Sequence, residues 1–218
     1  MTALVFDLDG TLIDTAPDLA AATNAVLSAS GRASVDETQL RHMVGMGARS
    51  LIIQAFAATG EEAREADLPR LMELFLAHYR ANIARASRPF PGVEETLTAL
   101  AARGTPLAVL TNKPDALARL LLSELKLARF FGAIFGAGAR PYAKPDPRIF
   151  GDVLGALGSA RGIMIGDSVT DVATARGAGA PVILVSYGYT PEPAASLGAD
   201  AVTDDFASNP ALAARLGF

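Results

Sequence analysis

Polar side chains that could bind phosphate and a metal ion occur in four separate segments of this chain, each following a predicted strand. These side chains are Asp7 and Asp9, Thr111 and Asn112, Lys144, and Asp167 and Asp171. Carboxylate oxygens are ligands for hard cations, hydroxyl and amide groups donate hydrogen bonds to phosphate oxygens, and an ammonium group balances phosphate charge. One acidic turn would be weak evidence, but four such segments together predict one site for phosphate chemistry.

Asp7 and Asp9 are separated by one residue on an extended segment, so their side chains are expected to leave the same face. Two carboxylates this close resist simultaneous ionisation unless a cation neutralises them or one of them carries a proton. The pair therefore suits a division of labour between a nucleophile and a general acid that later acts as general base. Asp167 would complete an oxygen site, and Mg²⁺ fits because it needs few protein carboxylates and binds substrate phosphate directly.

Lys144 is followed by a proline-rich segment that stiffens the backbone, so its ammonium group is expected to be held beside the acids. There it would keep the nucleophile ionised and balance phosphate charge. Thr111 and Asn112 are expected to donate hydrogen bonds to phosphate oxygens. Gly10 and Thr11 are expected to do the same through their backbone amides.

Asp171 follows Asp167 by four residues, which would place the two side chains one helical turn apart if a helix begins there. Three roles remain open for Asp171 at this point. It could bind a metal-bound water, orient Lys144, or only cap the helix predicted to begin near Val172.

The elements that must position these residues alternate between strands and helices. Buried parallel strands are predicted from short apolar runs at residues 3–6, 107–110, 133–136, 162–165 and 181–185. Helices are predicted at residues 93–103, 115–127, 148–157 and about 172–176. This alternation predicts an α/β fold with a doubly wound, Rossmann-like parallel sheet, in which ligands bind beyond the carboxyl ends of the strands.

A different pattern occupies the region just after the first strand. Long helical stretches rich in alanine and leucine appear there, for example at residues 18–28 and 68–83, and no convincing strand interrupts them. We therefore predict a small all-helical cap at residues 15–86, inserted into a catalytic α/β core formed by residues 1–14 and 87–218, with boundaries good to a few residues.

Composition excludes several classes of function. The chain has 218 residues, half of them hydrophobic, and a net charge of −4, which argues against disorder and against nucleic-acid binding. It has no apolar run long enough to span a membrane and no cysteine, so thiolate metal sites and thiol catalysis are excluded. These features favour a soluble, cytoplasmic protein whose chemistry would depend on oxygen ligands.

Taken together, the four segments resemble the motifs of the haloacid dehalogenase superfamily. The resemblance rests on DLDGTL at residues 7–12, LTNK at 110–113, KPDP at 144–147 and GDSVTD at 166–171. Their order and spacing match the superfamily across essentially the whole chain. The aspartate at position 9 favours the phosphatases of that superfamily over its dehalogenases, which lack this acid/base.

The resemblance also implies a role for each motif residue. Asp7 would be the nucleophile and a Mg²⁺ ligand, and Asp9 would be the acid/base and a ligand through its main-chain carbonyl. Asp167 would be a further Mg²⁺ ligand. Asp171 and Ser168 would support the site, and Thr111 and Lys144 would bind phosphate.

Within the predicted cap, residues 42–49 resemble the substrate-specificity turn of phosphoglycolate phosphatases. Gly45 and Gly47 would allow the cap backbone to approach a small ligand closely. We hypothesise that Arg49 binds the carboxylate of that ligand, because its guanidinium group matches carboxylate geometry. The alternative is a surface arginine at the start of a helix.

The function implied is Mg²⁺-dependent hydrolysis of a small phosphomonoester through an aspartyl-phosphate, with phosphoglycolate as the preferred substrate. The alternatives within the superfamily are a sugar-phosphate phosphatase, a phosphomutase, a pyrophosphatase and a nucleotidase. A non-enzymatic binding module is disfavoured because every motif position is retained.

Overall fold

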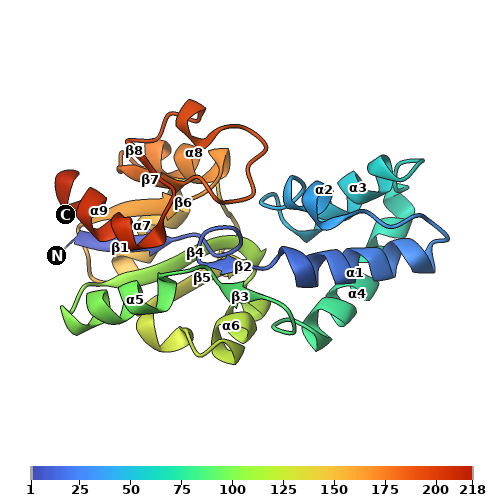
Figure 1. Ribbon diagram of the computed structural model, residues 1–218, viewed down its shortest axis with the longest axis horizontal. Coiled ribbons are helices and arrows are strands. Elements are labelled where there is room, and N and C mark those ends of the chain that lie inside the picture. The colour runs from blue at the N-terminus through green and yellow to red at the C-terminus, as the bar shows by residue number, and fades with distance from the viewer. Residues whose placement is uncertain (1, 218) are drawn as a thin grey trace.

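A computed structural model describes residues 2–217 of the chain. Across these residues a six-stranded sheet has the strand order β5-β4-β1-β6-β7-β8 (Figure 1). The strands are β1 (Thr2–Phe6), β4 (Leu107–Pro114), β5 (Ala133–Ala137), β6 (Arg161–Gly166), β7 (Val182–Val185) and β8 (Ala201–Thr203). Every neighbouring pair is parallel, so the predicted α/β fold class is confirmed.

Both faces of the sheet are buried, which explains why its strands read as unbroken apolar runs. In β1, Leu4 and Phe6 pack into the core on one face, whereas Ala3 and Val5 pack into the core on the other. The first core also contains side chains of α5 (Val93–Ala102), α6 (Asp115–Glu124) and α9 (Asn209–Arg215). The second contains side chains of α7 (Arg148–Ala156) and α8 (Val169–Gly177).

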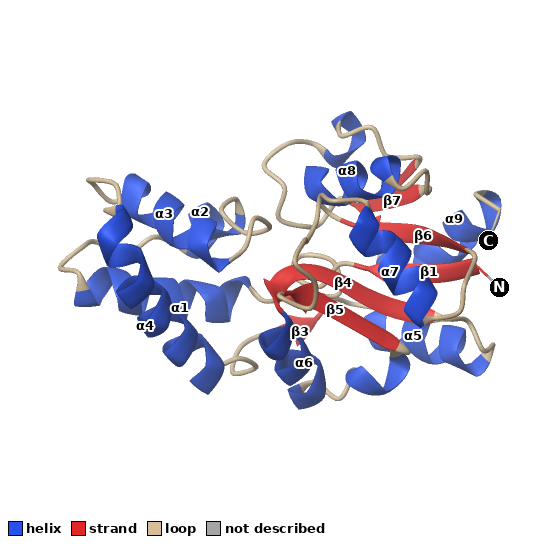
Figure 2. Ribbon diagram, turned by 180° about the vertical axis from the view of Figure 1, so that it is seen from behind, coloured by secondary structure: helices blue, strands red, loops and turns tan. Residues whose placement is uncertain are grey.

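Four helices lie to one side of this sheet, beyond the edge at which β1 and β4 end (Figures 1 and 2). They are α1 (Ala16–Ala29), α2 (Glu37–Arg41), α3 (Ala48–Ala58) and α4 (Leu68–Ala81). The chain enters and leaves this group through a short antiparallel pair formed by β2 (Ile13–Asp14) and β3 (Arg88–Pro89). We call residues 15–86 the helical cap, and their status as a separate domain stays a prediction.

Several element boundaries differ from those predicted. β4 extends to Pro114 with a register shift after Leu110, so Thr111 and Asn112 lie within the strand and do not follow it. α8 begins at Val169, earlier than the predicted Val172, because Ser168 caps it. The short elements β8 and α9 carry too few residues to give a periodic signal. In residues 2–217, no helix combines the length and apolar character that crossing a membrane requires.

Candidate active site

Asp7 lies directly after β1, where the carboxyl end of the strand opens toward the helical cap. Its Oδ1 atom accepts a hydrogen bond from the Leu8 amide at 2.7 Å, and its Oδ2 atom lies 2.9 Å from the Lys144 Nζ atom. The side chain is buried. One carboxylate oxygen is thus held by the backbone and the other by an ammonium group.

Lys144 connects the segment after β5 to two acids. Its Nζ atom lies 2.6 Å from Asp171 Oδ1 as well as 2.9 Å from Asp7 Oδ2. Burial alone would lower the pKa of Lys144, but the carboxylates of Asp171 and Asp7 outweigh burial and raise this pKa above its ordinary value. Lys144 therefore stays charged between two buried acids.

Asp171 both caps α8 and orients Lys144. Its Oδ2 atom accepts hydrogen bonds from the Ser168 amide at 3.1 Å, the Ser168 hydroxyl at 2.7 Å and the Asp167 amide at 3.2 Å. Its Oδ1 atom accepts from Lys144. Gly166 makes room for it, since a Cβ atom at position 166 would lie 2.3 Å from the Asp171 Cγ atom. A role in capping alone is therefore excluded for Asp171.

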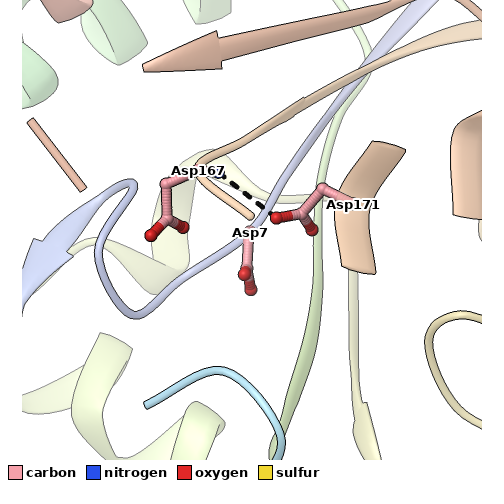
Figure 3. A group of neighbouring side chains, drawn as sticks. All are labelled: Asp7, Asp167 and Asp171. Carbon is pink, nitrogen blue, oxygen red and sulfur yellow. Dashed lines mark hydrogen bonds between the residues drawn. The ribbon is translucent and has the colours of Figure 1, made fainter. Parts of the chain in front are cut away.

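Asp167 reaches the same place from the end of β6. Its Oδ1 atom accepts from the Thr11 hydroxyl at 2.8 Å, and its Oδ2 atom accepts from the Tyr189 amide at 2.7 Å. Figure 3 shows Asp167 and Asp171 on either side of Asp7. One oxygen from each of these three carboxylates lies within 4.8 Å of the others, so three acids from two strand ends and one helix form a single cluster.

This cluster holds more negative charge than Lys144 neutralises. Burial raises the pKa of Asp7 from 3.8 to about 7, with Lys144 lowering it and Asp171 raising it. Burial, together with the charges of Asp7 and Asp171, raises the pKa of Asp167 from 3.8 to about 8. Asp167 therefore has no positive partner in this cluster, and Asp7 shares Lys144 with Asp171. A hard divalent cation among these oxygens would supply the missing positive charge.

Asp9 is held apart from this cluster by a different set of partners. Its Oδ1 atom accepts from the Thr15 hydroxyl at 2.7 Å and from Lys113 Nζ at 3.0 Å, while Oδ2 lies 3.2 Å from the same Nζ. Asp7 and Asp9 nevertheless line the same cavity. The two acids thus line one cavity, and each is paired with a different lysine.

That cavity lies between the sheet edge and the helical cap. Its floor contains Asp7, Asp9 and Thr111, and its cap side contains the turn around Gly45 together with side chains of α3 and α4. A pocket closed by acids on one side and largely apolar cap residues on the other suits a small ligand whose phosphate contacts the sheet edge.

Comparison with known proteins identifies the family. Residues 1–179 match the model of the haloacid dehalogenase-like hydrolase family. The chain belongs to this family. The resemblance seen in the four motifs is thereby confirmed.

Two curated relatives and one solved structure match nearly the whole chain. The phosphoglycolate phosphatase of Agrobacterium fabrum is 47% identical, covering 97% of this chain and 92% of its own length. The phosphoglycolate phosphatase of Caulobacter vibrioides is 46% identical, and the match covers 95% of this chain and 88% of that protein's length. A crystal structure described as a predicted phosphoglycolate phosphatase from Haemophilus somnus has a TM-score of 0.91 and 32% identity, covering 98% of each chain.

Four of the residues predicted for this hydrolase come together as a bonded group, namely Asp7, Lys144, Asp167 and Asp171, with Ser168 beside them. Thr111 is buried and lines the same cavity as Asp7. Asp9 is absent from the cluster of side-chain carboxylates, and Asp171 takes its place there. Any metal contact from Asp9 would therefore come from its main chain, as the family resemblance implies.

The backbone amides of Gly10 and Thr11 do not have the role that we predicted for them. The Gly10 amide donates to the Ile13 carbonyl at 3.0 Å, and the Thr11 amide donates to the Leu8 carbonyl at 3.4 Å. The tight turn after Asp9 uses both donors internally. Gly10 instead allows a close approach, because its φ is +83° and a Cβ atom there would lie 2.5 Å from Asp167 Oδ2.

The amide group of Asn112 is also used within the protein. Its Nδ2 atom donates to the Gly45 carbonyl and to the Lys144 carbonyl, each at 3.2 Å. This amide therefore joins the cap turn to the segment that carries Lys144. Asn112 thus positions these two segments in the structure, whereas we predicted that its amide would donate a hydrogen bond to phosphate.

Arg49 does not reach the cavity. Its Nη2 atom lies 2.6 Å from both carboxylate oxygens of Glu65, and both side chains are largely exposed. Arg49 is also absent from the residues that line the cavity. Its position agrees with the alternative that we considered, in which Arg49 is a surface arginine at the start of α3.

Two residues of the site were not predicted. Lys113 is buried against Asp9, and alternation along a strand would have placed it on the same face as Thr111. Tyr189 donates its amide to Asp167, and its hydroxyl accepts from the amides of Thr15 and Ala16. Nothing in the sequence around Tyr189 indicates this link between the acid cluster and the start of α1.

The acid cluster predicts that stability depends on pH and on added Mg²⁺. Asp7 and Asp167 bind protons more tightly in the folded chain than in the unfolded chain, because their folded pKa values are about 7 and about 8 against 3.8. The metal-free protein should therefore lose stability as pH rises from about 4 to about 8. Mg²⁺ bound among these oxygens would compete with the protons, so the stabilisation that it gives should grow over the same range. Thermal unfolding measured across this range with Mg²⁺ and with chelator tests this, and a Mg²⁺ effect that is constant with pH would contradict it.

Proposed function

We propose that this hydrolase removes the phosphoryl group from phosphoglycolate through an aspartyl-phosphate formed on Asp7. The observation that carries the proposal is the pairing of Asp7 with Lys144 beside a second acid, Asp9, which lines the same cavity and is bonded to another lysine. The names of the two curated relatives support the choice of phosphoglycolate. The cysteine-free composition supports a place in the cytoplasm.

In the first step a lone pair on a carboxylate oxygen of Asp7 attacks phosphorus, and the bond between phosphorus and the ester oxygen breaks. Asp9 gives its proton to that leaving oxygen, so glycolate departs as the alcohol. Thr111 and Lys144 bind the phosphate oxygens, which lie close to Asp7 during the transfer. The contact with Lys144 keeps Asp7 oriented and its charge balanced.

In the second step a water molecule attacks phosphorus and releases phosphate from Asp7. Asp9, now ionised, takes a proton from this water and is restored to its starting state. Because Asp9 has its own partners in Thr15 and Lys113, it can change protonation state without disturbing the Lys144 contact to Asp7.

Asp7, Asp167 and the main-chain carbonyl of Asp9 would hold Mg²⁺. When bound, this ion supplies positive charge that offsets the repulsion between the carboxylates and the phosphate. Asp171 has both oxygens engaged by Lys144 and by the start of α8, so we assign it the positioning of Lys144. The helical cap, residues 15–86, selects the substrate and excludes bulk water during the reaction.

Phosphate release from a panel of esters tests this function. The panel contains phosphoglycolate, ethyl phosphate, a hexose phosphate, pyrophosphate and a nucleoside monophosphate, each with Mg²⁺ and with chelator. The expected result is the highest kcat/KM for phosphoglycolate and no release with chelator. Preference for another ester would overturn the substrate, and isomerisation of the hexose phosphate without phosphate release would indicate a phosphomutase.

A further inference from the structure

We propose that Lys113 and Tyr79 form the subsite that binds the substrate carboxylate, an inference that rests on the proposed function. The hypothesis that Arg49 has this role is not supported by its position, because Arg49 is paired with Glu65 outside the cavity. A carboxylate-bearing substrate still requires a positive partner there. The cavity itself contains one.

Lys113 is the only lysine or arginine among the described residues that line the cavity. Its side chain is 3% exposed, and within residues 2–217 Asp9 is its only hydrogen-bonding partner. The Nζ atom also lies 4.4 Å from the centroid of the Tyr79 ring on α4. An ammonium group has three donors, so Lys113 can contact a second carboxylate while it remains bonded to Asp9.

Tyr79 supplies a second, independent indication of a ligand. It lines the cavity and is 1% exposed, yet its hydroxyl has no hydrogen-bonding partner within the part of the chain that the structure describes. Burial, with the charges of Asp9 and Asp18, raises the pKa of Tyr79 well above its ordinary value, so the hydroxyl remains a donor. Because a buried donor without an acceptor is unfavourable, a ligand oxygen beside Lys113 would complete this site.

The covalent structure of phosphoglycolate places its carboxylate next to this pair. Asp9 must contact the ester oxygen in order to protonate it, and the carbon that bears this oxygen also bears the carboxylate. A residue bonded to Asp9 is thus beside the substrate carboxylate when phosphorus faces Asp7. Lys113 then lies between the Asp9 carboxyl group and the substrate carboxylate, and its charge attracts the substrate carboxylate. The apolar side chains of Leu51, Phe75 and Leu117 around it strengthen this charge interaction by excluding water.

The alternative role for Lys113 is to position Asp9 alone, and substrate comparison separates the two. Lys113→Met should lower kcat/KM for phosphoglycolate about 10- to 100-fold more than for ethyl phosphate, which has the same leaving oxygen but no carboxylate. Tyr79→Phe should also lower kcat/KM for phosphoglycolate more than for ethyl phosphate, by about 3- to 10-fold. Equal losses on both esters in Lys113→Met would overturn the carboxylate subsite and leave Lys113 as a positioning residue for Asp9.

Arg49→Met is the matched control, because it removes a cation of the cap outside the cavity. It should leave the ratio of the two kcat/KM values unchanged, and a selective loss on phosphoglycolate in Arg49→Met would overturn the inference. Residual turnover of ethyl phosphate shows that each variant is folded, and Lys113→Gln provides a second variant if Lys113→Met is insoluble. If the wild-type protein itself shows no preference for phosphoglycolate over ethyl phosphate, the proposed substrate fails, independently of Lys113.

Discussion

Replacing Asp7 with asparagine is expected to lower kcat by at least about 10⁴-fold, because an amide cannot form the aspartyl-phosphate. The change is nearly isosteric and removes one of three carboxylates that crowd the same buried space. The variant should therefore fold, and in the presence of chelator near pH 8 its melting temperature should equal or exceed that of the wild-type protein. Initial rates of phosphate release and thermal melts on the same preparation measure both effects.

Asp9→Asn is the control that separates the two acids. It should also lower turnover, but Asp7 remains able to accept a phosphoryl group from a reactive ester. Intact-mass measurement should therefore detect a phosphorylated protein for Asp9→Asn and none for Asp7→Asn. Turnover near the wild-type rate by Asp7→Asn, in protein shown by mass to be free of deamidation, would remove Asp7 as the nucleophile.

The acid cluster could be predicted from the sequence because it depends on backbone topology. Asp7 and Asp167 follow strands that prove to be neighbours, β1 and β6, and the carboxyl ends of parallel neighbours meet at one sheet edge. Asp171 and Ser168 could be placed because a helix must begin soon after β6. The family motifs then added the roles of these side chains.

The contacts among the side chains that line the cavity could not be predicted, because they depend on which side chains pair across long sequence separations. Asp9 and Lys113 are 104 residues apart, and Tyr79 reaches Lys113 from a cap helix whose orientation the sequence does not define. Arg49 illustrates the same difficulty, since its exposed partner Glu65 lies across a loop of the cap. The amides of Gly10 and Thr11 were assigned to phosphate because the sequence does not reveal the internal bonds of their turn.

Lys144 is the residue on which the charge balance of the site depends, and Lys144→Met should damage both stability and turnover. Asp171 is fully buried and Asp7 nearly so, and both would lose the ammonium that they share. Removing one partner of a buried ion pair costs about 3–5 kcal/mol. With chelator near pH 8, the free energy of unfolding should fall by about that amount, as measured by denaturant titration.

The loss should be smaller near pH 6, because the pKa of Asp7, raised to about 7 by burial in the wild-type protein, can only rise further once Lys144 no longer opposes that shift. Protonation of Asp7 then removes one of the two unpaired charges. Phosphate release should fall by at least about 10³-fold, since the transferring phosphoryl group loses a fixed positive partner. Arg49→Met, which breaks an exposed pair, should cost less than about 1 kcal/mol under the same conditions. If Lys144→Met unfolds at the same denaturant concentration as Arg49→Met, then Lys144 does not hold Asp7 and Asp171 together, and the charge balance assigned to this site is wrong.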